Sequence, residues 1–168
     1  MIDGAPENVK RDKAGRAVEF TTTEARGSFE ITWKISYEGD GLRPSLYERT
    51  HETVRQNGDR ISVYESFTGE DVPVRYELSI WIPRDEKYDP YETIEYVEVD
   101  KRAGRYKMQR KIGDSSATRA EFTKDELIKK TYASLKPGRD ELRRLNAALA
   151  EGREGGEINE PQSSLPLY

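Results

Sequence analysis

The chain has 168 residues, a formal net charge of −4, a single histidine and no cysteine. The near balance of acidic and basic residues favours neither nucleic acid nor a membrane surface as a partner. The absence of cysteine excludes disulfides, thiol catalysis and thiolate metal sites.

The first sixteen residues are polar and contain Gly4 and Pro6. We expect residues 1–16 to form an N-terminal arm and residues 17–151 to form a single β-rich domain. The N-terminus has no basic end followed by an apolar run, so we expect no secretory signal peptide. No apolar stretch approaches the roughly 20 residues of a membrane span. The expected location is therefore the cytoplasm or a virion.

The segment Phe29–Tyr37 has the clearest pattern in the sequence. Apolar and polar residues alternate along it, which is typical of a strand with one buried face. The pattern predicts an antiparallel sheet with one apolar and one polar side. We expect Trp33, at the centre of the apolar row, to lie in the main core.

The pair Asn57-Gly58 favours a two-residue hairpin turn, because both residues tolerate positive φ. That turn would place Val54 opposite Ile61 and Glu52 opposite Val63. One face of the hairpin would then be apolar. The other, which we call the predicted Arg/Tyr face, would carry Tyr47, Arg49, His51, Arg55, Arg60 and Tyr64. Arginine with tyrosine is common in protein interfaces and in sites that bind single-stranded nucleic acid, so these six residues are candidate partner-binding residues.

The same turn would bring Glu52 and Glu65 to one face, as diagonal neighbours about 7–8 Å apart. Two carboxylates at such spacing can divide acid and base roles in glycoside hydrolysis. The alternative is that both carboxylates lie in water. His51-Glu52 begins like a zinc-protease helix, but Arg55 stands where the second histidine is required. No other catalytic or phosphate-binding motif occurs, and we expect no catalytic residue, metal or cofactor.

Residues 72–82 alternate again, and residues 93–112 predict a second hairpin. A loop at 101–104 would place Asp100 opposite Arg105 and Glu98 opposite Lys107. Val97 and Val99 would then meet apolar residues on the inner face. Residues 101–111 contain six basic residues and no acid, but this register would pair them with the acidic strand before them.

The period changes after residue 122, where Thr123 and Glu126 form a capping box. The segment Lys136-Pro137-Gly138 favours a break. The sequence therefore predicts a helical hairpin over about residues 123–150, with its second helix starting near Arg139.

Residues 152–168 are rich in Gly, Glu, Ser and Pro, and predict a flexible tail. The tail ends in a small apolar cluster, which adds Leu165, Leu167 and Tyr168 to the candidate partner-binding residues.

The expected fold is α+β and mainly β: an antiparallel sandwich or barrel of about six to eight strands, followed by the helical hairpin. A compact β-domain with arms resembles, in architecture alone, bacteriophage tail, neck and capsid-associated proteins and small subunits of large complexes. The expected function is a non-enzymatic assembly subunit with other protein chains as partners. The alternatives are a nucleic-acid-binding β-module, and a small ligand-binding barrel or glycosidase-like enzyme.

Overall fold

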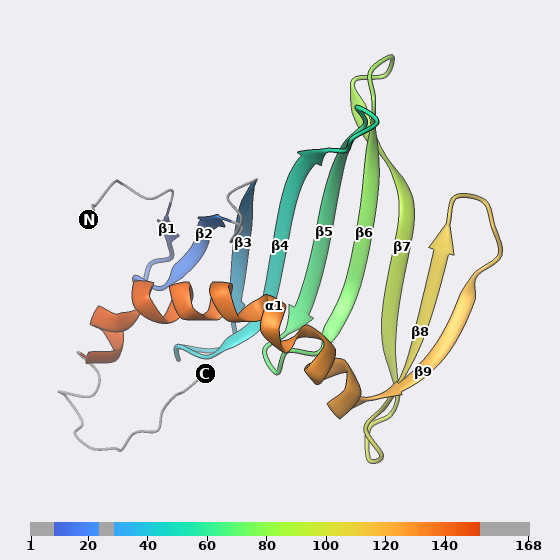
Figure 1. The fold of residues 1–168 in the computed structure, drawn as a ribbon. Coiled ribbons are helices and arrows are strands. Elements are labelled where there is room, and N and C mark those ends of the chain that lie inside the picture. The colour runs from blue at the N-terminus through green and yellow to red at the C-terminus, as the bar shows by residue number, and fades with distance from the viewer. Residues whose placement is uncertain (1–8, 24–28, 152–168) are drawn as a thin grey trace.

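In the part of the chain that the structure describes, nine consecutive strands form one antiparallel sheet, and a long helix follows them (Figure 1). The computed structural model describes residues 9–23 and 29–151. The strands are β1 (Lys10–Arg11), β2 (Ala17–Thr23), β3 (Glu30–Tyr37), β4 (Pro44–Val54), β5 (Arg60–Thr68), β6 (Pro73–Ile82), β7 (Lys87–Asp100), β8 (Arg105–Ile112) and β9 (Thr118–Thr123). The helix is α1 (Lys124–Leu145).

The sheet is a meander in which every strand pairs with the next one along the chain. Its first and last strands do not pair, so it remains open. The antiparallel, mainly β class with a helical C-terminal part is confirmed. The expected sandwich or barrel of about six to eight strands is not confirmed, because the described strands form one open sheet of nine. Short connections keep sequence neighbours paired, so no described strand crosses to a second layer.

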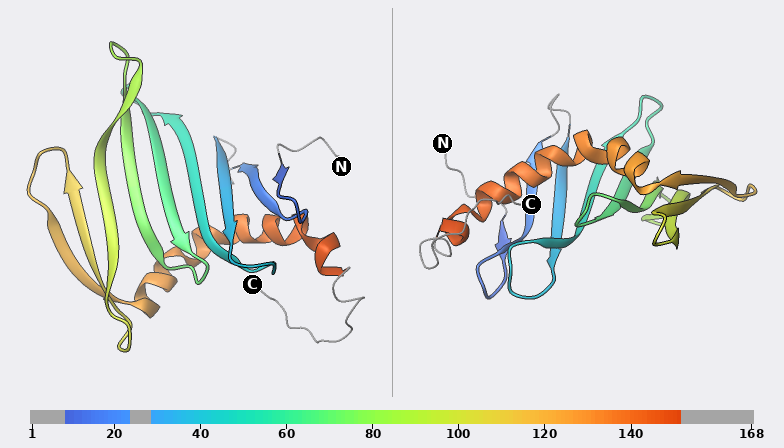
Figure 2. Two further views of the ribbon diagram at one scale, coloured as in Figure 1. Left: turned by 180° about the vertical axis from the view of Figure 1, so that it is seen from behind. Right: turned by 90° about the horizontal axis from the view of Figure 1, so that it is seen from below.

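Helix α1 lies across one side of the sheet, and its axis crosses the strands (Figures 1 and 2). We call this side the helix-covered face and the opposite side the outer face. The main core lies between α1 and the N-terminal half of the sheet, where Trp33 and Phe20 stack with ring centroids 6.2 Å apart. Trp33 is completely buried, while Lys34 and Glu30 on the outer face are exposed. The alternation predicted for Phe29–Tyr37 is therefore confirmed.

The expected helical hairpin is wrong, because α1 continues through Pro137 as one helix. The capping box of Thr123 and Glu126 is confirmed. Gly138 marks a close approach to the sheet: a Cβ atom there would lie 2.5 Å from the ring of Trp33. Leu135 and Leu142, one turn to either side, are also buried against the sheet. Tertiary packing on both sides of Pro137 thus outweighs the local preference for a break.

Polar contacts hold the helix at its middle and at its C-terminal end. The Arg139 guanidinium pairs with Asp71, in the turn between β5 and β6. Burial raises the pKa of the Asp71 carboxyl, and the Arg139 charge opposes that shift. At the other end, fully buried Asn146 accepts a hydrogen bond from the Ala17 amide at 2.9 Å and donates one to the Tyr37 hydroxyl at 3.0 Å. The helix therefore has a fixed position along the sheet.

The hairpin between β4 and β5 has a different turn from the predicted one. The Gly58 amide donates to the Arg55 carbonyl at 2.9 Å, and Gly58 has a φ of 94°. The Asn57 side chain accepts from the Asp59 amide at 2.9 Å. This is a three-residue loop with a bulge at glycine. It places Val54 opposite Arg60 and Thr53 opposite Ile61, a shift of one residue.

The hairpin between β7 and β8 is also shifted, because a bulge lies between Glu98 and Asp100. The predicted pair Asp100–Arg105 is confirmed, but Lys107 lies opposite Val97 and not opposite Glu98. Val97 and Val99 are 60% and 50% exposed, so their predicted inward orientation is wrong.

We predict that Gly138→Ala lowers the free energy of unfolding by about 1–3 kcal/mol, because the added methyl group collides with the Trp33 ring. Helix propensity alone would make this substitution stabilising by about 1 kcal/mol. Urea denaturation measures the change. In a Trp33→Leu background the same substitution should cost much less; an equal cost in both backgrounds would contradict the contact.

Replacing Trp33 by Ala should cost roughly 3–5 kcal/mol of unfolding free energy, since it leaves a cavity beneath α1. Lys34→Ala, its neighbour on the outer face, is the control and should change stability by less than about 0.5 kcal/mol. Equal effects of the two substitutions would show that the indole is not central to the core.

Candidate functional site

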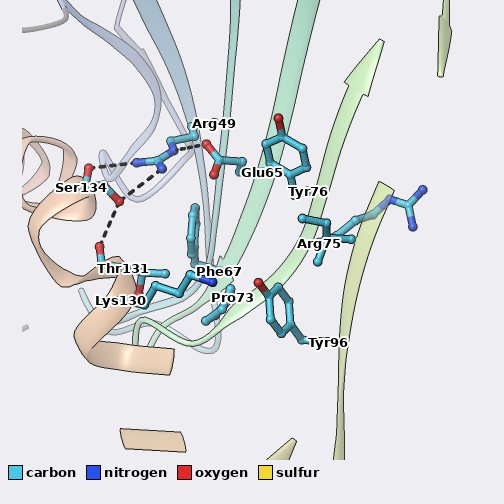
Figure 3. A pocket seen from close by; sticks show the side chains of 11 residues that line it. Arg49, Glu65, Phe67, Pro73, Arg75, Tyr76, Tyr96, Lys130, Thr131 and Ser134 are labelled. Atoms are coloured by element: carbon cyan, nitrogen blue, oxygen red, sulfur yellow. Dashed lines mark hydrogen bonds and ion pairs between the residues drawn. The ribbon is translucent and has the colours of Figure 1, made fainter. Parts of the chain in front are cut away.

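A cleft of about 240 Å³ lies between the N-terminal half of α1 and the helix-covered face of strands β4–β7 (Figure 3). The helix contributes polar groups, and the sheet contributes aromatic and charged ones. Its lining residues are Arg49, Glu65, Phe67, Pro73, Arg75, Tyr76, Ile94, Tyr96, Lys130, Thr131 and Ser134.

Arg49 forms one wall of the cleft and ties the sheet to the helix. It is 9% exposed, and its Nε donates to Glu65 at 2.9 Å. Its Nη1 donates to the Ser134 carbonyl at 2.9 Å. The guanidinium also lies over the rings of Phe67 and Trp33, at 4.8 and 5.4 Å from their centroids. Its Nη2 also donates to the Ser134 hydroxyl at 3.3 Å, so three of the roughly five N–H donors of a guanidinium are used within the protein. Arg49 therefore mainly shapes the cleft.

Lys130 and Tyr96 point toward one another across the cleft (Figure 3). The Lys130 ammonium lies 5.5 Å from the ring centroid of Phe122, and no carboxylate in the described chain pairs with it. The Tyr96 hydroxyl likewise has no hydrogen-bond partner among the described residues. Burial raises the pKa of Tyr96, and the nearby Glu65 charge adds to that shift. The hydroxyl therefore remains a hydrogen-bond donor at neutral pH.

The rest of the cleft is mixed in character. Phe67, Pro73 and Ile94 give apolar contact area. The Arg75 guanidinium points away from the cleft and pairs with Glu95 at 2.6 Å (Figure 3). An ammonium and a hydroxyl donor beside an apolar wall are suited to a carboxylate that is attached to an apolar group.

The six strand residues of the predicted Arg/Tyr face do not lie together. Tyr47, Arg49 and His51 lie on the helix-covered face, since they pair with Phe67, Glu65 and Val63. Arg60 and Tyr64 lie on the outer face, and Arg55 lies in the turn. The one-residue shift of the hairpin is the cause, because it reverses which side chains of β5 share a face with those of β4.

The same shift separates Glu52 from Glu65, so the proposed acid–base pair is wrong. Glu52 lies on the outer face, where it accepts a hydrogen bond from the Tyr88 hydroxyl at 2.9 Å. Glu65 lies on the helix-covered face and pairs with Arg49. The described residues contain no group of three or more acidic or histidine side chains that could hold a metal ion.

The basic residues of segment 101–111 are partly neutralised. Arg105 pairs with Glu121, and Arg110 pairs with Glu92 at 2.6 Å. Lys107 and Lys111 have no carboxylate partner in the part of the chain that the structure describes. The tail candidates Leu165, Leu167 and Tyr168 lie outside the described residues.

The sequence did not single out Tyr96, Lys130 or Ser134 as functional residues. Lys130 and Ser134 are one helical turn apart, which places them on one side of α1. Ile94 and Tyr96 alternate on β7, which places them on one face of the strand. The helical and strand spacings show that the two residues of each pair lie on the same side of their element. No local pattern in the sequence shows that the helix packs over β7.

Comparisons with protein-family models, curated proteins and solved structures found no match for this chain. Among the described residues, no helix has the length and apolar character needed to cross a membrane.

His51 should make stability depend on pH. Its ring stacks on Phe29 with centroids 4.5 Å apart, and burial lowers its pKa below the ordinary 6.5; Glu65 opposes this effect and Arg49 adds to it. The unfolded chain therefore takes up a proton near pH 6.5 while the folded chain does not. The free energy of unfolding should fall as the pH falls below about 6.5 toward the lowered pKa.

Urea denaturation of the unchanged protein and of His51→Gln at pH 7.5, 6.5 and 5.5 measures this contribution. As the pH is lowered, the free energy of unfolding should fall more for the unchanged protein than for His51→Gln. Equal pH dependence of both proteins would contradict the lowered pKa of His51.

Proposed function

We propose that this chain is a non-enzymatic subunit of a larger protein assembly, and that its cleft holds an acidic side chain of a neighbouring protein chain. The cytoplasm or a virion, such as a bacteriophage tail, neck or capsid, is the setting we propose for this assembly. The observation that carries the proposal is the pair formed by Lys130 and Tyr96, two donors that face each other across the cleft and make no hydrogen bond or ion pair with a described residue.

The chemistry of the cleft favours a carboxylate over other groups. Removing an ammonium from water is unfavourable unless an opposite charge replaces the lost hydration. A partner carboxylate between Lys130 and Tyr96 would supply that charge and would accept the hydroxyl hydrogen bond. The apolar groups of Phe67, Pro73 and Ile94 would contact the aliphatic part of the same acidic residue or its neighbour.

The fixed position of α1 supports a binding role. Ser134 is held by Arg49, and Asp71 holds Arg139, about two and a half turns from Lys130. The cleft therefore has its shape before a partner arrives, which reduces the entropy lost on binding.

We predict that a blocked pentapeptide, acetyl-Ala-Val-Glu-Val-Ala-amide, binds in the cleft. In a titration of 15N-labelled protein, amide signals around residues 94–96 and 130–134 should shift, and the affinity should fall with added salt. The same peptide with Gln in place of Glu should bind at least about tenfold more weakly, because hydrogen bonds to charged groups are the stronger ones.

Lys130→Gln and Tyr96→Phe should each weaken binding of the Glu peptide by about tenfold. Lys129→Gln is the matched control: Lys129 and Lys130 are both exposed on the same helix and the charge change is identical, but Lys129 does not line the cleft. A titration with sodium acetate tests the alternative of a small-molecule carboxylate ligand. Equal binding of the Gln peptide, or an equal loss in Lys129→Gln, would contradict the proposal.

A further inference from the structure

The last strand of the sheet has an open side. Strand β9 pairs with β8 on one side, and no described residue pairs with its other side. In Figure 1 it is the outermost strand on the right, and α1 turns from its end back over the sheet, away from that edge. An exposed strand edge presents unpaired amide and carbonyl groups, to which another strand can add.

Two opposite charges flank the centre of β9. Arg119 and Glu121 lie on the outer face, opposite Gln109 and Lys107 of β8. Arg119 has no carboxylate partner in the described chain. Glu121 pairs with Arg105 and has a side chain that is 53% exposed. Ala120 lies between them and points to the helix-covered face.

The spacing of these charges selects one way for two copies to pair. In an antiparallel pair of identical strands related by a two-fold axis, the register is centred on one residue. Centring on Arg119 or on Glu121 would place like charges opposite each other. Centring on Ala120 places Arg119 of each copy opposite Glu121 of the other, and directly opposed unlike charges stabilise a strand pair.

We propose that β9 pairs with β9 of a second copy, in antiparallel orientation and centred on Ala120, to give a homodimer with one continuous sheet. The dimer contains two reciprocal Arg119–Glu121 pairs on the outer face. Both copies of α1 lie on the other side of the joined sheet. This inference does not depend on the cleft, because the edge and the cleft use different residues.

Reversal of one charge per chain tests the register. The unchanged protein should sediment with twice the 19.3 kDa chain mass. Arg119→Glu and Glu121→Arg should each raise the dimer dissociation constant by at least about tenfold, since each places two pairs of like charges face to face. An equimolar mixture of the two variants should recover the dimer, because every pair across the edge then joins opposite charges.

Arg102→Glu is the control for the change in net charge made by Arg119→Glu, since Arg102 is exposed in the turn between β7 and β8. It should dimerise like the unchanged protein. The proposal fails if the unchanged protein is monomeric at 0.5 mM, if both single variants remain dimers, or if the mixture stays monomeric. Circular dichroism of each variant checks that its fold is retained, and sedimentation is interpreted only for variants that keep it.

Discussion

The packing of α1 on the indole of Trp33 is the contact on which the rest of the structure depends. An open sheet with one apolar face needs a second layer, and in the described chain only this helix provides one. Gly138 lets the helix approach the ring, and Leu135 and Leu142 fill the space to either side. This contact also explains why the helix continues through Pro137, since a break there would uncover the core.

The same contact links the core to the cleft. Arg49 rests on the Trp33 and Phe67 rings, while its donors reach Glu65 and the backbone of Ser134. The buried guanidinium of Arg49 thus contacts the main core on one side and forms a wall of the cleft on the other. A change in the core at Trp33 would alter the position of Arg49 and, through it, the helix segment that carries Lys130.

Local patterns in the sequence identified most elements but not how they fit together. The alternation of Phe29–Tyr37 predicts its strand correctly, and the capping box of Thr123 predicts the start of α1 correctly. Each of these patterns depends only on residues that are close together in the sequence. The predicted registers of the two hairpins are each off by one residue. The cause is one extra residue in a bulge, at the glycine after Asn57 in one hairpin and near Val99 in the other. The local sequence predicts a helix break at Gly138, because the group that requires a glycine there, the Trp33 ring, lies far away in the sequence.

The order of the chain has a consequence for synthesis in the cell. Trp33 leaves the ribosome roughly a hundred residues before Gly138, which at 5–20 residues per second is on the order of 5–20 s. Each hairpin of the meander can form as it emerges, but during that interval the apolar face has no helix to cover it. Until the helix has been made, the apolar face of the nascent sheet is exposed to contact with other apolar surfaces.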